Sequence, residues 1–261
     1  MAITRKTDLQ RIGLKKFSAY SVFSFFSRNH RQSLKPLLTD MHSHLLPGID
    51  DGVQTSEESF AIIDQLLELG YKKIITTPHI MTDYYGNTAE TISKAYLQFL
   101  TILRDKGYSI PFHCAAEYYL DEKVFGWVAG KKKLMTFGDR YFLFETNVVS
   151  EPLQLKEFIF RLTSQGFKPI IAHPERYQYM TLEKAEDLKH RGVLLQINLL
   201  SLIGYYGPPI QKFAEKLIGR GWVDLLGSDC HNLEHVSLLK KVQHTKLYRK
   251  ALDLPLVNYS L

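Results

Sequence analysis

Two histidines separated by one residue, His42 and His44, precede a short segment that carries the adjacent acids Asp50 and Asp51. Side chains alternate between the faces of a strand, so both imidazoles project to the same side if this segment is extended. Neutral imidazole and carboxylate are the donors that zinc, manganese or iron ions prefer. This spacing alone is weak support for a metal site, because histidines at strand ends also have ordinary structural roles.

Further acids and histidines follow short apolar segments along the chain. They are His79, Glu117, Glu145, His173, Asp229 and His231. Each alone has an ordinary explanation, such as a solvated carboxylate at Glu117 or Glu145. Together with His42, His44 and Asp51 they make nine candidate ligands. One ion takes about four to six ligands, so the set predicts two or three ions that share carboxylates.

The remaining histidines do not fit this pattern. His30 lies in the N-terminal region, and His190, His235 and His244 fall on predicted helices, where we expect them to be solvated. His113 falls in the middle of a predicted strand, where we expect a packed and hydrogen-bonded side chain.

Short strands and amphipathic helices alternate along the chain and determine where the candidate ligands lie. Strands are predicted at residues 37–42, 73–77, 111–116, 140–144, 168–172, 193–198 and 223–228. Helices are predicted at residues 56–69, 88–106, 121–129, 152–165, 182–191, 209–220 and 234–249. Short apolar strands between such helices favour a parallel sheet covered by helices.

Seven such β/α units favour an α/β fold in the form of a distorted (β/α)7 barrel, with a doubly wound open sheet as the alternative. Sites in these barrels are built at the C-terminal ends of the strands. Six of the seven predicted strands bring a candidate ligand to that end. The sequence therefore predicts a metal site at the C-terminal rim of the barrel.

The composition, with 45% apolar and 12% aromatic residues, indicates a folded globular chain. Its net charge of +6 is concentrated in residues 1–36, which carry eight of the 33 basic residues and one of the 27 acidic residues. The rest is near neutral and gives no case for binding to nucleic acid. We expect a basic, flexible N-terminal extension at residues 1–36 and one domain at residues 37–261.

The apolar run at residues 17–26 is too short to span a bilayer, and no small-residue cleavage site follows it. A mis-assigned start is one alternative for this region, and weak attachment to a membrane surface is another. Two cysteines, Cys114 and Cys230, cannot make a disulfide framework, so a cytoplasmic location is the simplest expectation.

Several motifs resemble those of the polymerase and histidinol phosphatase (PHP) superfamily. Within it, the chain looks like the bacterial manganese-dependent protein-tyrosine phosphatases of the CpsB/YwqE type, which belong to capsule and exopolysaccharide operons. The matching segments are Asp40–His44, Ile49–Gly52, Thr77–His79, Ala116–Tyr119, Phe144–Glu145, Ala172–Tyr177 and Ser228–Asn232. The last two are the most specific to the tyrosine-phosphatase branch.

The resemblance implies a barrel of the PHP type that hydrolyses phosphotyrosine by a metal-activated hydroxide. It places the metal ligands at His42, His44, Asp51, His79, Glu117, Glu145, His173, Asp229 and His231, and the catalytic arginine at Arg176. It implies two or three manganese ions, with iron or zinc as alternatives. The residues at 80–85 depart from the basic residues of streptococcal relatives, which puts the preference for peptide substrates in question.

The resemblance also implies partners. The substrate would be a phosphotyrosine protein, namely a tyrosine kinase of the polysaccharide operon, and relatives of this type assemble as homo-oligomers. The expected location is the cytoplasm, with peripheral contact to the inner membrane through the basic extension.

Two other functions remain open. One is a PHP phosphoesterase for a small phosphate monoester such as histidinol phosphate, and the other is a metal-stabilised interaction module without turnover. A cysteine-dependent mechanism is excluded, because it needs an arginine six positions after the cysteine. Leu120 and Val236 stand at those positions.

Overall fold

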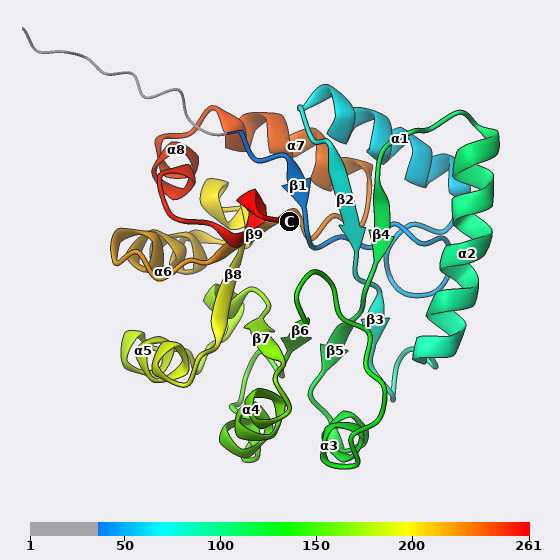
Figure 1. Cartoon of the computed structure of the whole chain (residues 1–261). Helices are drawn as coiled ribbons and strands as arrows, with labels where there is room; N and C mark the ends of the chain where they lie inside the picture. Colours follow the sequence, from blue (N-terminus) through cyan, green and yellow to red (C-terminus); the bar gives the residue numbers. More distant parts are fainter. Residues whose placement is uncertain (1–35) are drawn as a thin grey trace, which may run out of the picture. The chain divides into compact units, whose positions relative to one another are not determined.

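Short parallel strands form the centre of the computed structural model, which describes residues 36–261 (Figure 1). All seven predicted strands are confirmed, and two further short strands, β3 and β5, are present. The strands are β1 (Thr39–Asp40), β2 (Lys73–Thr76), β3 (His79–Ile80), β4 (Phe112–Cys114), β5 (Glu117–Tyr119), β6 (Tyr141–Glu145), β7 (Lys168–Ile171), β8 (Leu194–Asn198) and β9 (Leu225–Gly227).

The two additional strands arise because two of the predicted strands are kinked. β2 continues as β3 after Thr77 and Pro78, and β4 continues as β5 after Ala115 and Ala116. Proline has no N–H for the ladder, which explains the break before β3. The kinks divide the hydrogen bonding into two parallel sheets, with strand orders β1-β2-β4 and β3-β5-β6-β7-β8-β9.

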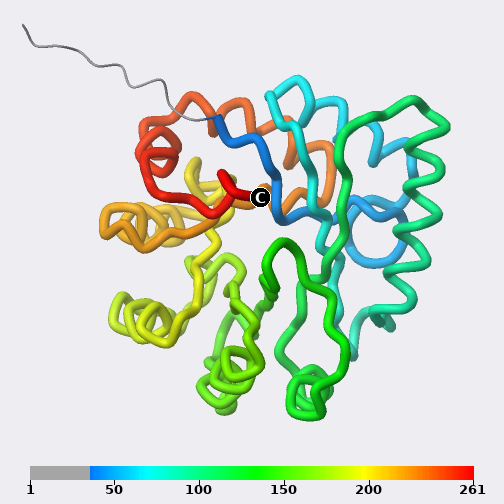
Figure 2. Tube along the Cα trace, viewed as in Figure 1, coloured from blue at the N-terminus to red at the C-terminus, as the bar shows by residue number. Residues whose placement is uncertain are grey.

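The chain after β1 pairs with the chain after β9 and closes the ring of strands. The His44 N–H donates to the Cys230 carbonyl at 2.9 Å, and the Asp229 N–H donates to the His42 carbonyl at 2.8 Å. The strands therefore curl into the predicted distorted (β/α)7 barrel rather than an open sheet (Figure 2). The closing bonds involve candidate ligands themselves, so barrel closure and the site are built from the same residues.

Helices lie around the outside of the ring of strands (Figure 1). Several begin with the expected side-chain caps; for example, Thr55 and Glu58 form a capping box at the start of α1. The helices are α1 (Ser56–Glu68), α2 (Ala89–Asp105), α3 (Glu122–Ala129), α4 (Leu155–Ser164), α5 (Leu182–His190), α6 (Pro208–Gly219), α7 (Leu233–Gln243) and α8 (Lys246–Leu252). Three short 3-10 turns complete the described chain: η1 (Pro174–Arg176), η2 (Leu199–Ile203) and η3 (Val257–Tyr259).

The single final helix predicted at residues 234–249 is wrong, because the segment forms α7 and α8. The Thr245 hydroxyl accepts a hydrogen bond from the Tyr248 N–H at 3.1 Å and so acts as the N-cap of α8. A threonine that caps a new helix ends the preceding one, since its own backbone is extended.

Apolar side chains fill the space between the strands and the helices. Ile62, Ile63 and Leu66 of α1 are fully buried, and the Phe144 ring of β6 meets the Phe158 ring of α4 edge-on at 5.4 Å. A smaller cluster takes one or two side chains each from β2, β6, β7 and β9 and includes Met41 after β1. Burying such side chains contributes about 1.5–3 kcal/mol each, so packing on both faces of the strands holds the rim in place.

Two expectations about histidines outside the predicted site can be checked in the fold. His190 and His244 are exposed, as predicted. The prediction of a packed His113 is wrong: Phe112 takes the buried face of β4, and alternation leaves His113 exposed. His30 and almost all of the predicted N-terminal extension lie outside the described residues. Among residues 36–261 no helix is long and apolar enough to cross a membrane.

Candidate metal centre

All nine predicted ligands meet at the C-terminal rim of the barrel. Eight of them form three groups in which the donor atoms lie within 4.8 Å of one another. The groups are His44, Asp51, His79 and His231; His42, His44, Glu117 and Asp229; and His79, Glu117 and Glu145. Each pair of groups has one residue in common: His44, His79 or Glu117. The ninth residue, His173, contacts Glu117 through Nε2 at 3.1 Å.

Glu117 lies at the centre of the cluster and is fully buried. Its Oε2 lies 3.1 Å from Nε2 of His42, 3.4 Å from Nε2 of His44 and 3.3 Å from Nδ1 of His79. Its other oxygen faces His173. Glu117 belongs to two of the three groups and would help to hold an ion in either of them.

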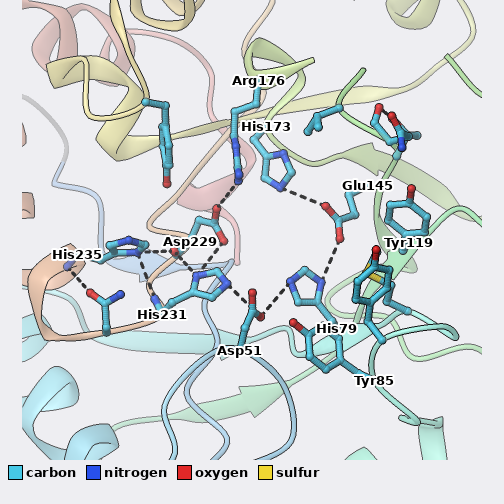
Figure 3. A pocket seen from close by; sticks show the side chains of 17 residues that line it. Asp51, His79, Tyr85, Tyr119, Glu145, His173, Arg176, Asp229, His231 and His235 are labelled. Atoms are coloured by element: carbon cyan, nitrogen blue, oxygen red, sulfur yellow. Dashed lines mark hydrogen bonds and ion pairs between the residues drawn. The ribbon is translucent and has the colours of Figure 1, made fainter. Parts of the chain in front are cut away.

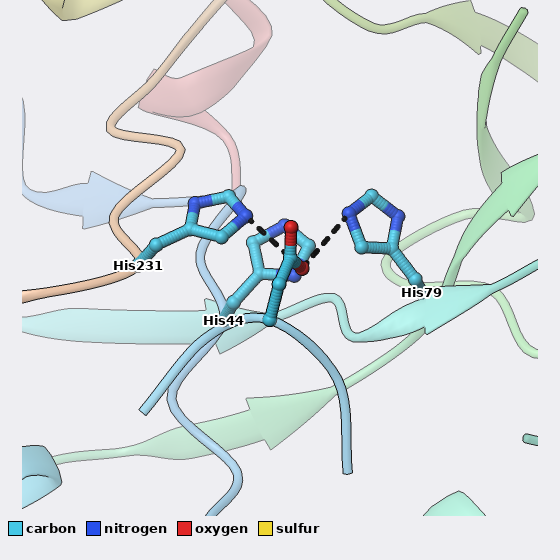
Figure 4. Close-up of side chains that lie close together, drawn as sticks. His44, His79 and His231 are labelled. Atoms are coloured by element: carbon cyan, nitrogen blue, oxygen red, sulfur yellow. Dashed lines mark ion pairs between the residues drawn. The ribbon is translucent and has the colours of Figure 1, made fainter. Parts of the chain in front are cut away.

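The outermost group lies on the solvent side of the cluster. His44, His79 and His231 converge on one point (Figure 4). Oδ1 of Asp51 lies 3.5 Å from Nε2 of His79 and 3.6 Å from Nε2 of His231, and about half of the Asp51 side chain is exposed. This group is therefore open to molecules that enter from solvent.

The neighbouring Asp50 has a different role. Its Oδ2 accepts hydrogen bonds from Nδ1 of His44 at 2.9 Å and from the His79 N–H at 3.0 Å. A carboxylate only accepts, so His44 must carry its proton on Nδ1 and offer Nε2 to the cluster. The structure thus places Asp51 in the cluster and Asp50 behind His44.

Charges in the cluster are strongly coupled. Burial alone would lower the pKa of His42, but the carboxylates of Glu117 and Asp229 raise it to about 9. Burial alone would raise the pKa of Glu117, but His42 and His79 hold it well below its usual value. Imidazole and carboxylate are therefore held against one another in a buried site, where divalent ions can take the place of the imidazole protons. The donor set fits divalent ions of the manganese, iron or zinc type.

Two candidate ligands have left-handed backbone conformations, which are rare for residues other than glycine. His173 after β7 has φ of 34°, and Asp229 after β9 has φ of 50°. Each costs of order 1–3 kcal/mol and persists only where the surrounding structure imposes it. In both cases the unusual turn directs the side chain back over the end of the barrel.

The turn at His173 also positions Arg176. The Arg176 N–H donates to the His173 carbonyl at 2.9 Å and closes the 3-10 turn η1. Nη1 of Arg176 lies 3.2 Å from Oδ2 of Asp229, and the guanidinium carbon lies 4.8 Å from the centre of the Tyr206 ring. Arg176 therefore pairs with Asp229 rather than with its neighbour Glu175. Glu175 is buried and accepts hydrogen bonds from the Asn198 N–H and the Ser201 hydroxyl.

A cavity of about 580 Å³ opens above the cluster, with Arg176 and Asp229 on one side and His79 and Glu145 on the other (Figure 3). Among the described residues that line it, Arg176 is the only lysine or arginine. Tyr84, Tyr85 and Tyr119 also line it and are called its aromatic rim below. The cavity therefore joins a cationic and metal-ligating floor to an aromatic rim.

The loop that carries Tyr84 and Tyr85 is held in place by hydrogen bonds. The Tyr85 N–H donates to the Met81 carbonyl at 2.8 Å, and the Thr82 N–H donates to Asp121 at 3.2 Å. The Asn87 side chain donates to the His79 carbonyl at 2.9 Å. This rim is pre-formed and tied to the strand that carries His79.

Sequence reasoning missed several residues of the site. His235 was predicted to be solvated, but it lines the cavity, because Asn232 caps α7 and turns its first residues toward the rim. Gln196 and Asn198 fall within the strand predicted at residues 193–198, and both are fully buried beside the cluster. Two amides at alternate positions of an apolar strand are the signal that could have identified them.

A parallel barrel with imidazole and carboxylate donors converging on its C-terminal rim is the architecture of a metal-dependent hydrolase of the β/α-barrel class. Residues 38–250 match the family described as capsular polysaccharide synthesis, CpsB/CapC. The chain therefore belongs to the CpsB/CapC family, as its motifs predicted.

Two curated relatives are similar over most of their length. The tyrosine-protein phosphatase YwqE of Bacillus subtilis (strain 168) is 28% identical over 204 residues, which cover 76% of this chain and 78% of that protein. The tyrosine-protein phosphatase CpsB of Streptococcus pneumoniae is 29% identical over 209 residues, covering 76% and 84%.

A solved structure supports the same relationship. It belongs to the crystal structures of YwqE from B. subtilis and CpsB from S. pneumoniae, which are described as metal-dependent tyrosine phosphatases. It superposes with a TM-score of 0.71 at 26% identity and covers 82% of this chain and 90% of that chain.

Proposed function

We propose that this protein is a metal-dependent protein-tyrosine phosphatase, a hydrolase of phosphoric monoesters. The observation that carries the proposal is the convergence of nine imidazole and carboxylate side chains beside Arg176, six of which line one cavity. The named activities of the CpsB and YwqE relatives support it. The proposed domain is residues 37–261, with residues 1–36 as an extension.

The nine residues would hold two or three divalent ions, and we propose manganese, with iron or zinc as alternatives. Because each pair of the three groups has one residue in common, the groups suit three neighbouring ions better than a single ion. Such ions would act as Lewis acids. They would lower the pKa of a bound water toward neutral pH and offset the negative charge of a phosphoryl group. The ligand assignments are His42, His44, Asp51, His79, Glu117, Glu145, His173, Asp229 and His231.

Arg176 is the proposed catalytic residue of the protein itself. Its guanidinium is fixed at one edge by Asp229 and on one face by Tyr206, which leaves other N–H groups free to point into the cavity. A planar guanidinium binds two phosphoryl oxygens at once and stabilises the negative charge that they carry in the transition state.

The aromatic rim supports an aryl rather than an alkyl phosphate. Tyr84, Tyr85 and Tyr119 line the cavity above the cluster, and ring pairs of this kind contribute about 0.5–1.5 kcal/mol beyond burial. A phenol with pKa about 10 also leaves more easily than an alkyl alcohol, so a tyrosine ester needs less help from a general acid.

The biological setting forms the last part of the proposal. The substrate would be a tyrosine-phosphorylated protein of the capsular polysaccharide machinery, namely its tyrosine kinase, which accords with the family. We propose a cytoplasmic location, peripheral contact with the inner membrane through residues 1–36, and assembly as a homo-oligomer. Cell fractionation of the full chain and of a chain starting at residue 37, with light scattering, would test these points.

The activity is tested by comparing three phosphate esters as substrates of manganese-loaded protein: a phosphotyrosyl peptide, a phosphoseryl peptide and histidinol phosphate. We expect the phosphotyrosyl peptide to have the highest kcat/KM. A preference for histidinol phosphate would favour a small-molecule phosphoesterase, and the absence of turnover on all three would favour an interaction module.

A further inference from the structure

Strand β8 lies within the ring of strands but brings none of the nine candidate ligands to the rim. Gln196 and Asn198 stand two residues apart on β8, so they face the same side of the sheet, and both are fully buried. Burying an amide without hydrogen-bond partners costs about 1–3 kcal/mol. Their presence at the end of this strand therefore needs an explanation beyond packing.

The two amides form a continuous chain of hydrogen bonds between two candidate ligands. Nδ1 of His42 lies 2.9 Å from Oε1 of Gln196. Nε2 of Gln196 donates to Oδ1 of Asn198 at 2.9 Å, and Nδ2 of Asn198 donates to Oδ2 of Asp229 at 2.6 Å. These hydrogen bonds run from His42 after β1, through β8, to Asp229 after β9. The two end segments are neighbours in the ring, since the Asp229 N–H also donates to the His42 carbonyl.

The direction of every bond in this chain follows from its end at Asp229. A carboxylate only accepts, so Asn198 must present its NH2 group to Asp229 and its oxygen to Gln196. Gln196 must then present its NH2 group to Asn198 and its oxygen to His42. His42 therefore carries a proton on Nδ1, which leaves Nε2 to face Glu117 and the cluster.

Asn198 also determines how Asp229 divides its two oxygens. Oδ2 accepts from Asn198 and from Arg176, whereas Oδ1 faces Nε2 of His42 at 3.3 Å and Nε2 of His44 at 3.5 Å. One carboxylate thus serves the cluster with one oxygen and holds the arginine with the other.

His42 and Gln196 pack directly against Gly227 of β9. A Cβ atom on Gly227 of β9 would lie 2.7 Å from Cβ of His42 and 2.9 Å from Nε2 of Gln196. Only glycine allows His42 and Gln196 to approach β9 so closely.

We propose that Gln196 and Asn198 are positioning residues for the reaction. Gln196 selects the His42 tautomer that can bind an ion, and Asn198 orients Asp229 so that ion binding and the placement of Arg176 depend on the same carboxylate. The part that concerns Arg176 rests on the proposed activity; the part that concerns ion binding rests only on the proposed metal ligands. Partners of this kind, behind the ligands, typically change metal affinity or activity by about 10- to 100-fold.

The test uses the full chain with Asn198→Asp, Asn198→Ala and Gln196→Leu. Asn198→Asp keeps the shape but sets an oxygen against Oδ2 of Asp229, so it should be the most damaging. We expect each variant to bind Mn²⁺ about 10- to 100-fold more weakly in titrations with Mn²⁺ alone, and to have a lower kcat at saturating Mn²⁺.

Asn258→Asp is the matched control. Asn258 is also a buried amide, but it binds backbone groups of Thr39 and Leu226 rather than any candidate ligand. We expect it to lower the melting temperature and leave the affinity for Mn²⁺ unchanged. The proposal is overturned if Asn198→Ala and Gln196→Leu bind Mn²⁺ within about twofold of wild type, or if Asn258→Asp loses affinity equally.

The two proposals can fail separately. If the wild-type chain hydrolyses no phosphotyrosine, the proposed function is wrong, but the titrations with Mn²⁺ still decide the role of the amides. If Asn198→Asp does not fold, the comparison of Asn198→Ala and Gln196→Leu with Asn258→Asp remains decisive.

Discussion

Nη1 of Arg176 lies 3.2 Å from Oδ2 of Asp229, and the other oxygen of the same carboxylate faces the buried histidines of the cluster. Burial alone would lower the pKa of Arg176, but Asp229 raises it, so the arginine stays charged beside the cavity. The residue proposed to bind the phosphoryl group is therefore anchored to a residue proposed to bind the ions.

Arg176→Ala should lower kcat on a phosphotyrosyl peptide about 10²- to 10³-fold, because it removes a preorganised donor to the transition state. Arg176→Lys should recover only part of this loss, since an ammonium cannot bind two oxygens in one plane. Steady-state kinetics and metal analysis on the same preparations check both. The control is Arg161→Ala, which changes a partly exposed arginine of α4 that pairs with Glu157. A loss of bound metal in Arg176→Ala equal to its loss of activity would contradict the assignment.

Removal of the ions should destabilise the fold. The carboxylates and imidazoles of the cluster would bind ions only in the folded state, so free metal at 100 times its Kd should stabilise the protein by about 2.7 kcal/mol. Thermal unfolding of chelated and manganese-loaded protein measures this difference. Equal melting temperatures in the two states would argue against a metal site.

The adjacent aspartates should differ in their effects. Asp51→Ala removes an oxygen from the outer group and should reduce the number of bound ions. Asp50→Asn keeps an acceptor near His44 but loses the charge, so it should keep the number of ions and weaken affinity about 10- to 100-fold. Metal analysis and titration with Mn²⁺ distinguish the two. Identical stoichiometry and affinity in both variants would mean that the roles are wrongly divided.

The tyrosine rim should control selectivity rather than chemistry. Tyr119→Leu and Tyr84→Ala should raise KM for phosphotyrosyl peptide by about 2- to 12-fold each, which corresponds to about 0.5–1.5 kcal/mol of lost ring contact. KM for an alkyl phosphate should not change. Tyr205→Leu serves as the control, since Tyr205 does not line the cavity. Equal losses on aryl and alkyl esters would show that the rim does not recognise the ring.

Thiol chemistry should be irrelevant to activity. Burial raises the pKa of Cys114 and of Cys230 well above the usual thiol value, so both remain protonated, and therefore weakly nucleophilic, near neutral pH. Treatment with iodoacetamide at pH 7.5 should leave phosphatase activity unchanged, and Cys114→Ser should behave like wild type. Rapid inactivation by alkylation would contradict the metal-dependent mechanism.

Most of the fold could be predicted from the sequence. The apolar periodicity of each strand or helix is consistent with the residues that begin and end it. β3 and β5 could not be predicted, since each is the continuation of a strand beyond a break, and segments of two or three residues are too short to have a periodicity of their own. The separation of α7 from α8 at Thr245 was missed because the apolar pattern continues through it.

The candidate ligands could be predicted from the sequence, because histidines and acidic residues at the ends of parallel strands meet when the strands close into a barrel. The residues that support these ligands could not be predicted. His235 depends on the angle at which α7 starts, and Gln196 and Asn198 depend on bonds to residues more than 20 positions away, namely His42 and Asp229. Such contacts exist only after the strands have been placed side by side.

The most direct test of the account is the activity of the full chain on a phosphotyrosyl peptide as Mn²⁺ is added back to chelated protein, with bound metal measured at each step. We predict that activity is absent without metal and rises with the number of ions bound until the cluster is filled. Full activity in protein shown to be free of metal would contradict the account.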